Sequence, residues 1–363
     1  MRAQPPSPTP AAAPPDGLDR RTFVRRSVGA GVAVAVPSWV LAACGSSATS
    51  GGGSVGAGGV VTIKATHGTG LCNLGIFLEK ERALAKPKVD LTFVVTPTNA
   101  DIATLFGAGQ VDASLIPYSN FMTVLDNGAP VKIAAGGGVQ GCVVCSQPGI
   151  PDAAALRGKT LGTFQADTLE MLALDYLVKN GMSFKDVKVK YFGTSPELAS
   201  AFIGGKIDAI SHIEPYATQV LRAVKGSHKL TDGIDVYMPG YTDCVLAVRD
   251  ALIKEQPAAV KALIKGLMMA QKQAETDRPS AAKLTTGTYY KAPYADVLDA
   301  SQKQPNVVDQ RGNTQFMLDR AKNLKKLGYI KKLPDRSIFD YSLLEQVIHE
   351  EPQLYKSLKL KFT

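Results

Sequence analysis

A short pattern of residues occurs twice in this chain, roughly one domain length apart. Residues 106–113 read FGAGQVDA and residues 202–209 read FIGGKIDA, and each copy is soon followed by Pro-Tyr, at Pro117 and Pro215. Two copies of a helix–glycine–strand–aspartate unit predict two similar α/β lobes. Because ligands of α/β proteins bind outside the carboxyl ends of the strands, the sequence also predicts a cleft between the lobes.

Strand-like and helix-like segments alternate along most of the chain. Residues 60–66 alternate apolar and polar side chains, whereas residues 73–84 place apolar side chains at helical spacing. The alternation continues to a strand expected at 244–248, and the rest of the chain is mostly helical. Strands that alternate with helices favour open, largely parallel sheets, so we expect an α/β fold. The 363 residues are enough for two lobes.

The first residues are typical of an export signal rather than of a folded domain, and we exclude residues 1–43 from the fold. The segment DRRTF at 19–23 looks like a twin-arginine (Tat) signal. The apolar stretch at 28–40 is shorter than the roughly 20 residues of a membrane span. It leads into LAACG at 41–45, which resembles a bacterial lipobox and predicts lipidation of Cys44. A plain transmembrane anchor is the alternative.

A Gly/Ser-rich segment follows the expected lipidation site. Residues 44–59 therefore read as a lipidated, flexible tether between the membrane and the body of the protein. No later stretch is long and apolar enough to span a bilayer, so we expect a soluble body. The expected location is the outer face of the cell membrane, periplasmic or cell-surface, through the lipid anchor.

Charge and motifs argue against two classes of function. The net charge is +9, but the basic residues stand singly or in pairs such as Lys331-Lys332, without the aromatic-interleaved runs of nucleic-acid-binding proteins. We therefore expect no nucleic-acid partner. The chain also lacks a P-loop, a GxGxxG motif after a strand and a nucleophile elbow. We expect no enzymatic activity and no cofactor.

Three groups of residues carry a resemblance to a known family. They are GQVDAS at 109–114, GGKIDA at 204–209 leading into Glu-Pro-Tyr at 214–216, and a C-terminal group comprising 327–330, 334–335 and 339–341. With them the chain resembles the nitrate/taurine/sulfonate-binding and thiamine-pyrimidine-precursor-binding proteins, from about residue 60 to about residue 355.

The resemblance implies the type II periplasmic-binding-protein fold, with two crossover strands and a C-terminal helical segment. Lobe 1 would comprise residues 60–147 and 245–363, lobe 2 residues 148–244, and the crossovers would lie near 145–151 and 240–245. In such proteins the lobes close on a ligand by a hinge motion. The closed form docks on the permease of an ABC importer, whose ATPase subunit drives uptake. A monomeric solute-binding lipoprotein that captures a small organic molecule is thus implied.

The resemblance also places the ligand pocket in the loops after the strands and in the first turns of the helices that follow. Glycines let backbone N–H groups approach a ligand there, and for the turn at 67–72 a tight turn without ligand contact is the alternative. Tyr118 could equally be a core aromatic, and Asp167 only a helix N-cap. The expected ligand-binding residues are His67, Thr69, Cys72, Tyr118, Ser119, Asn120, Gln140, Thr163, Gln165, Asp167, Thr168, His212, Glu214 and Tyr241.

The composition of these loops indicates which ligands to expect. None of them contains an arginine, which is the usual bidentate partner of carboxylates and sulfonates. Glu214, if it faces the ligand, favours a donor or a positive group. We therefore expect a neutral or amine-bearing organic molecule rather than a bare oxyanion.

Four cysteines remain after Cys44, and the sequence leaves their state open. The four residues Cys72, Cys142, Cys145 and Cys244 could be buried free thiols, or one disulfide could form, such as Cys142 or Cys145 with Cys244. A third alternative is a soft-metal site made of some of Cys72, Cys142, Cys244, His67 and His212. No ligand spacing on a single element favours the metal. Two other functions also stay open. One is a sensory or soft-metal-binding lipoprotein of the same fold, and the other is an enzyme similar to the fungal pyrimidine synthases. The chain lacks the consecutive cysteines of those synthases.

Overall fold

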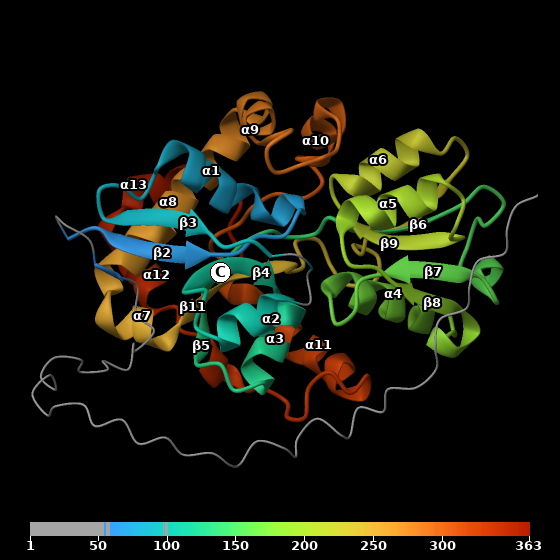
Figure 1. Cartoon of the computed structure of the whole chain (residues 1–363), viewed down its shortest axis with the longest axis horizontal. Coiled ribbons are helices and arrows are strands. Elements are labelled where there is room, and N and C mark those ends of the chain that lie inside the picture. Colours follow the sequence, from blue (N-terminus) through green and yellow to red (C-terminus); the bar gives the residue numbers. More distant parts are fainter. Residues whose placement is uncertain (1–53, 56–58, 97, 99–100) are drawn as a thin grey trace, which may run out of the picture. The chain divides into compact units, whose positions relative to one another are not determined.

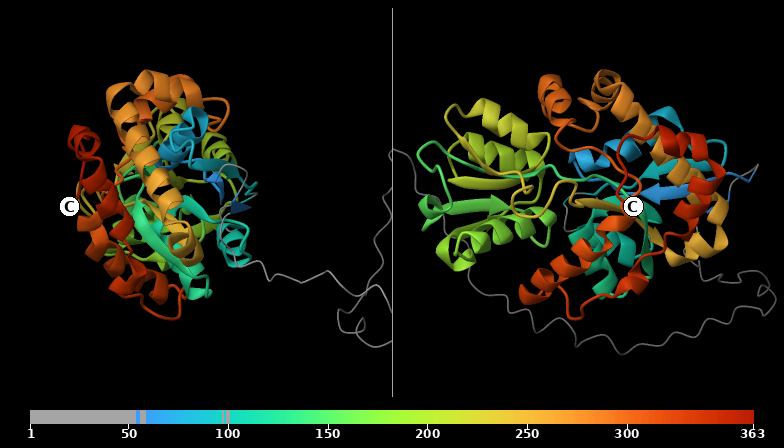
Figure 2. Two further views of the ribbon diagram at one scale, coloured as in Figure 1. Left: turned by 90° about the vertical axis from the view of Figure 1, so that its left-hand side faces the viewer. Right: turned by 180° about the vertical axis from the view of Figure 1, so that it is seen from behind.

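The computed structural model describes residues 54–55, 59–96, 98 and 101–363. The described residues belong to one compact unit, which is drawn in Figure 1 and, from two further sides, in Figure 2.

The N-terminal predictions fall outside this description. The export signal at 1–43 and the lipidated Cys44 lie outside the described residues, as does most of the tether at 44–59. They therefore remain predictions. Within the described part of the chain, no helix is both long enough and apolar enough to cross a membrane.

The strands form three sheets. Their orders are β1-β2-β3, β4-β11-β5 and β10-β6-β9-β7-β8 (Figure 1). The parallel pairs are β2 with β3, and β7 with both β8 and β9, whereas β6, β10 and β11 run antiparallel to their neighbours. The bounds are β1 Ser54–Val55, β2 Val61–Ala65, β3 Val89–Phe93, β4 Ala113–Pro117, β5 Val131–Gly136, β6 Cys142–Ser146, β7 Thr160–Thr163, β8 Lys188–Tyr191, β9 Ala209–Ile213, β10 His228–Thr231 and β11 Cys244–Arg249.

We call the half that contains β1–β5 and β11 lobe 1, and the half that contains β6–β10 lobe 2. In lobe 2, α5 and α6 cover one face of the sheet and α4 the other (Figure 1). After β11 the chain is helical, and α12 returns to pack on β5 and α8. The helices are α1 Leu74–Arg82, α2 Asp101–Gly107, α3 Tyr118–Asp126, α4 Thr168–Lys179, α5 Ser195–Ile203, α6 Tyr216–Ala223, α7 Asp250–Glu255, α8 Pro257–Thr276, α9 Arg278–Thr285, α10 Tyr294–Ala300, α11 Thr314–Lys326, α12 Ser342–Glu350 and α13 Pro352–Ser357.

One aspartate in each lobe ties two strands together. Oδ2 of Asp112, just before β4, accepts a hydrogen bond from Lys64 N of β2 at 3.0 Å, and Asp112 N donates to Lys64 O at 2.8 Å. Asp208, just before β9, makes the same pair with Thr160 of β7, at 2.8 and 3.0 Å. The pattern that recurs in the sequence thus has the same structural role in both lobes, which is to align the third strand of each unit with the first.

Two segments that run in opposite directions connect the lobes. The chain passes from β5 to β6 through residues 137–141 and returns from β10 to β11. Gly137 N donates to Cys244 O at 3.0 Å, and Gln140 N donates to Tyr241 O at 2.9 Å. The two connections are therefore a hydrogen-bonded pair rather than independent linkers.

The expected α/β fold with two crossover strands and a C-terminal helical segment is confirmed. Because β6 pairs with β9 and β10, the first passage between the sheets lies a few residues before the segment 145–151 that the sequence indicated. The lobe boundaries 60–147, 148–244 and 245–363 stay predictions.

We predict that Asp112→Ala lowers the free energy of unfolding by about 1–3 kcal/mol, because it removes the buried carboxylate and leaves the Lys64 N–H without its acceptor. Urea denaturation followed by circular dichroism measures the change. Asp112→Asn keeps an acceptor oxygen and should cost less. An equal loss in the two variants would show that the hydrogen bond does not carry the effect.

Candidate ligand-binding site

A small, partly open cavity lies between the two lobes. Its volume is about 30 Å³. A space of this size holds a water molecule or a single ion, whereas pockets for organic ligands usually measure about 300–1,000 Å³. An organic ligand therefore needs the lobes to separate further. The lining residues are Gly68, Thr69, Gly70, Cys72, Asn73, Ile102, Pro117, Phe164, Asp167, Thr168, Leu169, Ser195, Ile213 and Asp243.

Lobe 1 contributes the turn between β2 and α1. This turn runs into a short 3-10 helix, Leu71–Asn73, which carries Cys72. A Cβ on Gly70 would stand 2.8 Å from Ile213 Cγ1 of lobe 2, so glycine permits the close approach of the lobes here. Thr69 Oγ1 donates to Ser195 Oγ of α5 at 2.7 Å. The turn is thus held against lobe 2 by packing and by a hydrogen bond.

Lobe 2 contributes the N-terminus of α4. Asp167 is the N-cap of this helix and accepts from Leu169 N at 3.0 Å. Burial raises the pKa of Asp167 to about 7. The neighbouring Thr168 donates its hydroxyl proton to Asp243 Oδ1 at 2.5 Å. The capping function expected as an alternative for Asp167 is therefore present, and the residue also lines the cavity.

The carboxylate of Asp243 is the centre of the polar contacts around the cavity. It is 1% exposed and accepts from Thr168 Oγ1 of lobe 2 and, at 2.9 Å, from Gln304 Nε2. Among the described residues, no lysine or arginine forms an ion pair with it. Burial raises the pKa of Asp243, and hydrogen bonds from Thr168 and the neighbouring thiols oppose that rise.

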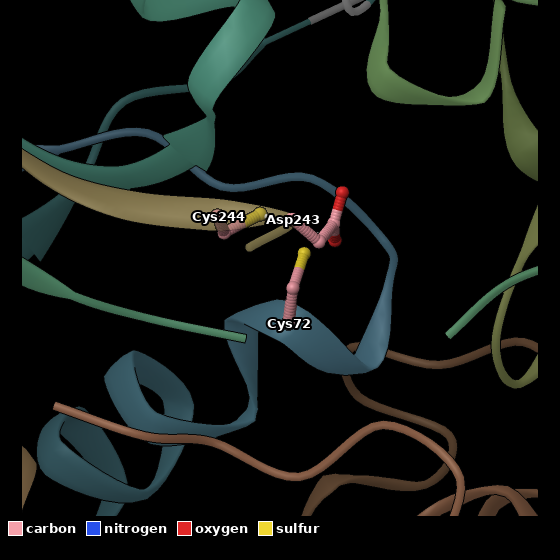
Figure 3. Close-up of side chains that lie close together, drawn as sticks. All are labelled: Cys72, Asp243 and Cys244. Carbon is pink, nitrogen blue, oxygen red and sulfur yellow. Dashed lines mark hydrogen bonds between the residues drawn. The ribbon is translucent and has the colours of Figure 1, made fainter. Parts of the chain in front are cut away.

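Three thiols surround the Asp243 carboxylate. Cys142 Sγ lies 3.5 Å from Oδ1 and Cys244 Sγ lies 3.5 Å from Oδ2, while Cys72 faces them from the lobe 1 turn (Figure 3). Cys145 lies apart from them. All four cysteines are free in the structure. Burial raises the pKa of each thiol, that of Cys72 to about 11, so none is activated as a nucleophile.

Four of the residues expected from the sequence line the cavity together, namely Thr69, Cys72, Asp167 and Thr168. The other ten do not line it. These are His67, Tyr118, Ser119, Asn120, Gln140, Thr163, Gln165, His212, Glu214 and Tyr241.

The two histidines expected in the pocket are engaged elsewhere. The His67 ring contacts Phe77 and Phe93 edge-on, at centroid distances of 5.0 and 4.8 Å. His212 Nδ1 accepts from Ile213 N at 2.9 Å, and Nε2 lies 3.0 Å from Ser195 O, so the ring is neutral and both nitrogens have partners. Burial lowers the pKa of His212 to about 4.

Several other expected residues are placed outside the lining of this cavity. Glu214 and Gln140 line a different cavity of about 390 Å³, together with Lys229 and Lys303. The Tyr241 hydroxyl donates to Asp232 O at 3.0 Å, which fixes it in lobe 2. Gln165 is exposed, and Tyr118, Ser119, Asn120 and Thr163 are buried.

Three polar lining residues were missing from the expected set. Asp243 stands on the return segment between the lobes, next to the strand expected at 244–248. Ser195 begins α5, and Asn73 ends the 3-10 helix. The sequence offered a signal for Asp243 only, since an acidic residue beside an expected crossover strand lies where the cleft should be.

A two-lobed α/β structure with paired crossover segments and a cavity between the lobes is the periplasmic-binding-protein fold. A family model described as NMT1/THI5 like matches residues 84–282. This match covers more than half of the chain, so the chain belongs to the NMT1/THI5-like family. A comparison with curated proteins found no significant match.

Solved structures agree on the fold at low sequence identity. The ligand-binding component of an ABC-type import system from Staphylococcus aureus, with zinc bound, is 17% identical, with a TM-score of 0.69 over 79% of this chain and 98% of that one. The aliphatic sulphonate-binding protein SsuA of Escherichia coli is 18% identical, with a TM-score of 0.64 over 76% and 91%. A C27S mutant of DszB, an enzyme, in complex with biphenyl-2-sulfinic acid, is 13% identical, with a TM-score of 0.61 over 80% and 99%. Both binding proteins and an enzyme thus share this fold.

The burial of Glu214 predicts a dependence of stability on pH. Desolvation raises the pKa of Glu214 from 4.5 to about 7, so the folded chain binds a proton more tightly than the unfolded chain does. This contribution to stability is complete below pH 4.5 and is lost as the pH rises through about 7. Glu214→Gln keeps an acceptor for Thr218 N and removes the charge. It should raise the free energy of unfolding at pH 8 by up to about 3 kcal/mol and leave it unchanged at pH 4.

Urea titrations of both proteins at the two pH values measure the difference. Glu255→Gln, at the exposed end of α7, serves as the control and should have no comparable effect. A Glu214→Gln protein that is less stable at pH 8 than the parent would contradict the assigned burial cost.

Proposed function

We propose that this protein is an extracytoplasmic solute-binding lipoprotein that captures a small ligand between its lobes and delivers it to an ABC importer. The observation that carries the proposal is the cavity between the lobes, which is lined by the first turn of a helix from each one. Membership of the NMT1/THI5-like family and the likeness in fold to two solute-binding proteins support it.

Contacts between the lobes away from the cavity support a closing motion. Asp175 of α4 accepts from Arg320 Nη1 at 2.7 Å and from Asn323 Nδ2 at 2.6 Å, both on α11. At another edge, Arg222 of α6 pairs with Asp296 of α10. These are polar, partly exposed contacts, and each contributes about 0–1 kcal/mol, so a ligand of moderate affinity is enough to shift the balance between open and closed forms.

The charges at the cavity favour a ligand that carries a positive or hydrogen-bond-donating group. Two carboxyl groups, those of Asp167 and Asp243, line it, and no lysine or arginine is among its lining residues. An oxyanion such as a sulfonate would meet these carboxyl groups without a compensating cation. Among small organic molecules, a neutral or amine-bearing one fits the lining best.

The partners in this proposal are a permease and its ATPase, with attachment to the membrane through Cys44 and the tether at 44–59. A sensory lipoprotein of the same fold is the second candidate. Enzymatic activity is not part of the proposal, since the raised pKa of Cys72 leaves its thiol protonated at neutral pH.

Native mass spectrometry of the protein purified from an expressing bacterium, without reductant, tests the capture of a ligand. We expect an additional mass that is lost on unfolding. A thermal-shift panel of alkylamines, pyrimidines and alkanesulfonates should then give stabilisation by amines or pyrimidines and none by sulfonates. Stabilisation by sulfonates alone would overturn the charge argument.

An uptake assay distinguishes the second candidate. A sensory lipoprotein would bind its ligand but would not support uptake when a permease and an ATPase are co-expressed.

Closure of the lobes predicts a second effect on binding. Thr69→Val removes the hydrogen bond to Ser195 across the cleft while keeping the shape of the side chain. The affinity for the stabilising ligand, measured by calorimetry, should fall about 2- to 10-fold. Thr276→Val, which removes a hydroxyl bond within α8, should leave the affinity unchanged. An unchanged affinity of Thr69→Val would argue against closure at this contact.

A further inference from the structure

Cys72, Asp243 and Cys244 bring three potential metal ligands together beside the cavity. One ligand atom from each residue lies within 4.8 Å of the others, and all three side chains are buried (Figure 3). Cys72 comes from the lobe 1 turn, whereas Asp243 and Cys244 come from the return segment and the start of β11. The cluster therefore forms only when the chain is folded.

The separations of the ligand atoms suit a tetrahedral metal ion. Bond lengths of about 2.3 Å to sulfur and about 2.0–2.1 Å to oxygen place the two atoms about 3.5 Å apart around a tetrahedral ion. The distance from Cys244 Sγ to Asp243 Oδ2 is 3.5 Å, and that from Cys142 Sγ to Asp243 Oδ1 is also 3.5 Å. Thiolates select soft or borderline cations such as Cu⁺ and Zn²⁺ over hard ones.

The surroundings hold this cluster in place. A Cβ on Gly138 would stand 2.4 Å from Cys72 Cα, so the crossover backbone packs directly against the backbone that carries this thiol. Gln304 Nε2 and Thr168 Oγ1 both donate to the Asp243 carboxylate, which orients it as partners of a metal ligand usually do.

Two further observations point to a ligand at this position. Asn73 lines the same cavity, is 1% exposed, and its Oδ1 has no hydrogen-bond partner among the described residues. The cavity of about 30 Å³ is lined by both Cys72 and Asp243, and it has room for an ion or a water molecule but not for an organic molecule.

We propose that Cys72, Cys244 and Asp243 form a binding site for one thiophilic cation, Zn²⁺ or Cu⁺, at the floor of the cleft. This inference rests on the proposed function in placing the ligand between the lobes, and it names a class of ligand for that site. The cation is held by bonds to two thiolates and a carboxylate, and the protons of the two thiols pass to solvent on binding.

The test uses the full chain, purified in detergent and reduced, with Zn²⁺ alone as the probe. We expect one zinc ion per chain by elemental analysis, and calorimetric binding that becomes weaker by more than about 100-fold in Cys72→Ser and in Cys244→Ser. Cys145→Ser is the matched control, because Cys145 is equally buried but lies outside the cluster. Its affinity for zinc should equal that of the parent.

A second readout is independent of folding differences between variants. Replacing zinc by Co²⁺ in the parent protein should give the charge-transfer absorption of cobalt bound to thiolates. Three results would overturn the proposal. The first is zinc binding that Cys72→Ser and Cys244→Ser leave unaffected. The second is a cobalt complex without thiolate absorption. The third is a Cys72–Cys244 disulfide that resists reductant and abolishes zinc binding, seen as a mass lower by about 2 Da that persists under reductant.

The outcomes separate this inference from the proposed function. A protein that co-purifies with an organic ligand and ignores zinc loses the metal site and keeps the capture function. A protein that binds zinc through both thiols, but supports no uptake of a ligand when a permease and an ATPase are co-expressed, keeps the metal site and loses the importer role.

Discussion

Each lobe is organised around one carboxylate that lies just before one strand and joins it to the backbone of another. Asp112 does this for β2 and β4, and Asp208 for β7 and β9, with two hydrogen bonds in each case. A backbone N–H in a folded chain needs an acceptor, and a side chain that supplies it also fixes the position of the strand that the side chain precedes. The turns that follow β2 and β7 both line the cavity between the lobes.

The cleft between those turns is completed by a residue from neither of them. Asp243 lies on the return connection, where its carboxylate accepts from Thr168 of lobe 2 and from Gln304 of the C-terminal region. A buried carboxyl group costs free energy unless it is hydrogen-bonded or neutralised, and here its partners come from both sides of the cleft. Opening the lobes would remove the Thr168 bond and admit water to the carboxylate. In the proposed function, ligand capture would thus be coupled to this polar network through Asp243.

The sequence predicted the local features well because they depend on neighbouring residues. Apolar spacing located α1, expected at 73–84 and found at Leu74–Arg82, and the repeated aspartate unit indicated the two lobes. Four residues expected at the ligand line the cavity for the same reason, since each stands in the connection or the first helical turn that follows a strand, namely Thr69, Cys72, Asp167 and Thr168. Their role in ligand binding stays a prediction. Asp243 was missed because its place in the cleft depends on the pairing of two connections about a hundred residues apart, as in the hydrogen bond from Asp243 N to Gly138 O.

His212 and Glu214 were expected at the cleft because His212 lies near the end of β9 and Glu214 directly follows it. In the structure, both ring nitrogens of His212 have partners within lobe 2, and Glu214 lines another cavity.

The charge balance of the cleft connects the organic-ligand and metal hypotheses. Two buried carboxyl groups and three thiols meet there, and no basic side chain is among the residues that line the cavity. In such a place the groups must either stay protonated or share a cation, because isolated negative charges are costly in a buried environment. An amine and a soft metal ion are two ways to supply the same positive charge. They differ in size and geometry, since Cys72, Cys244 and Asp243 place their ligand atoms within 4.8 Å of one another, whereas Asp167 caps α4 at the lobe 2 side. A cation at the floor would therefore leave the wider part of an opened cleft free for the rest of a larger ligand.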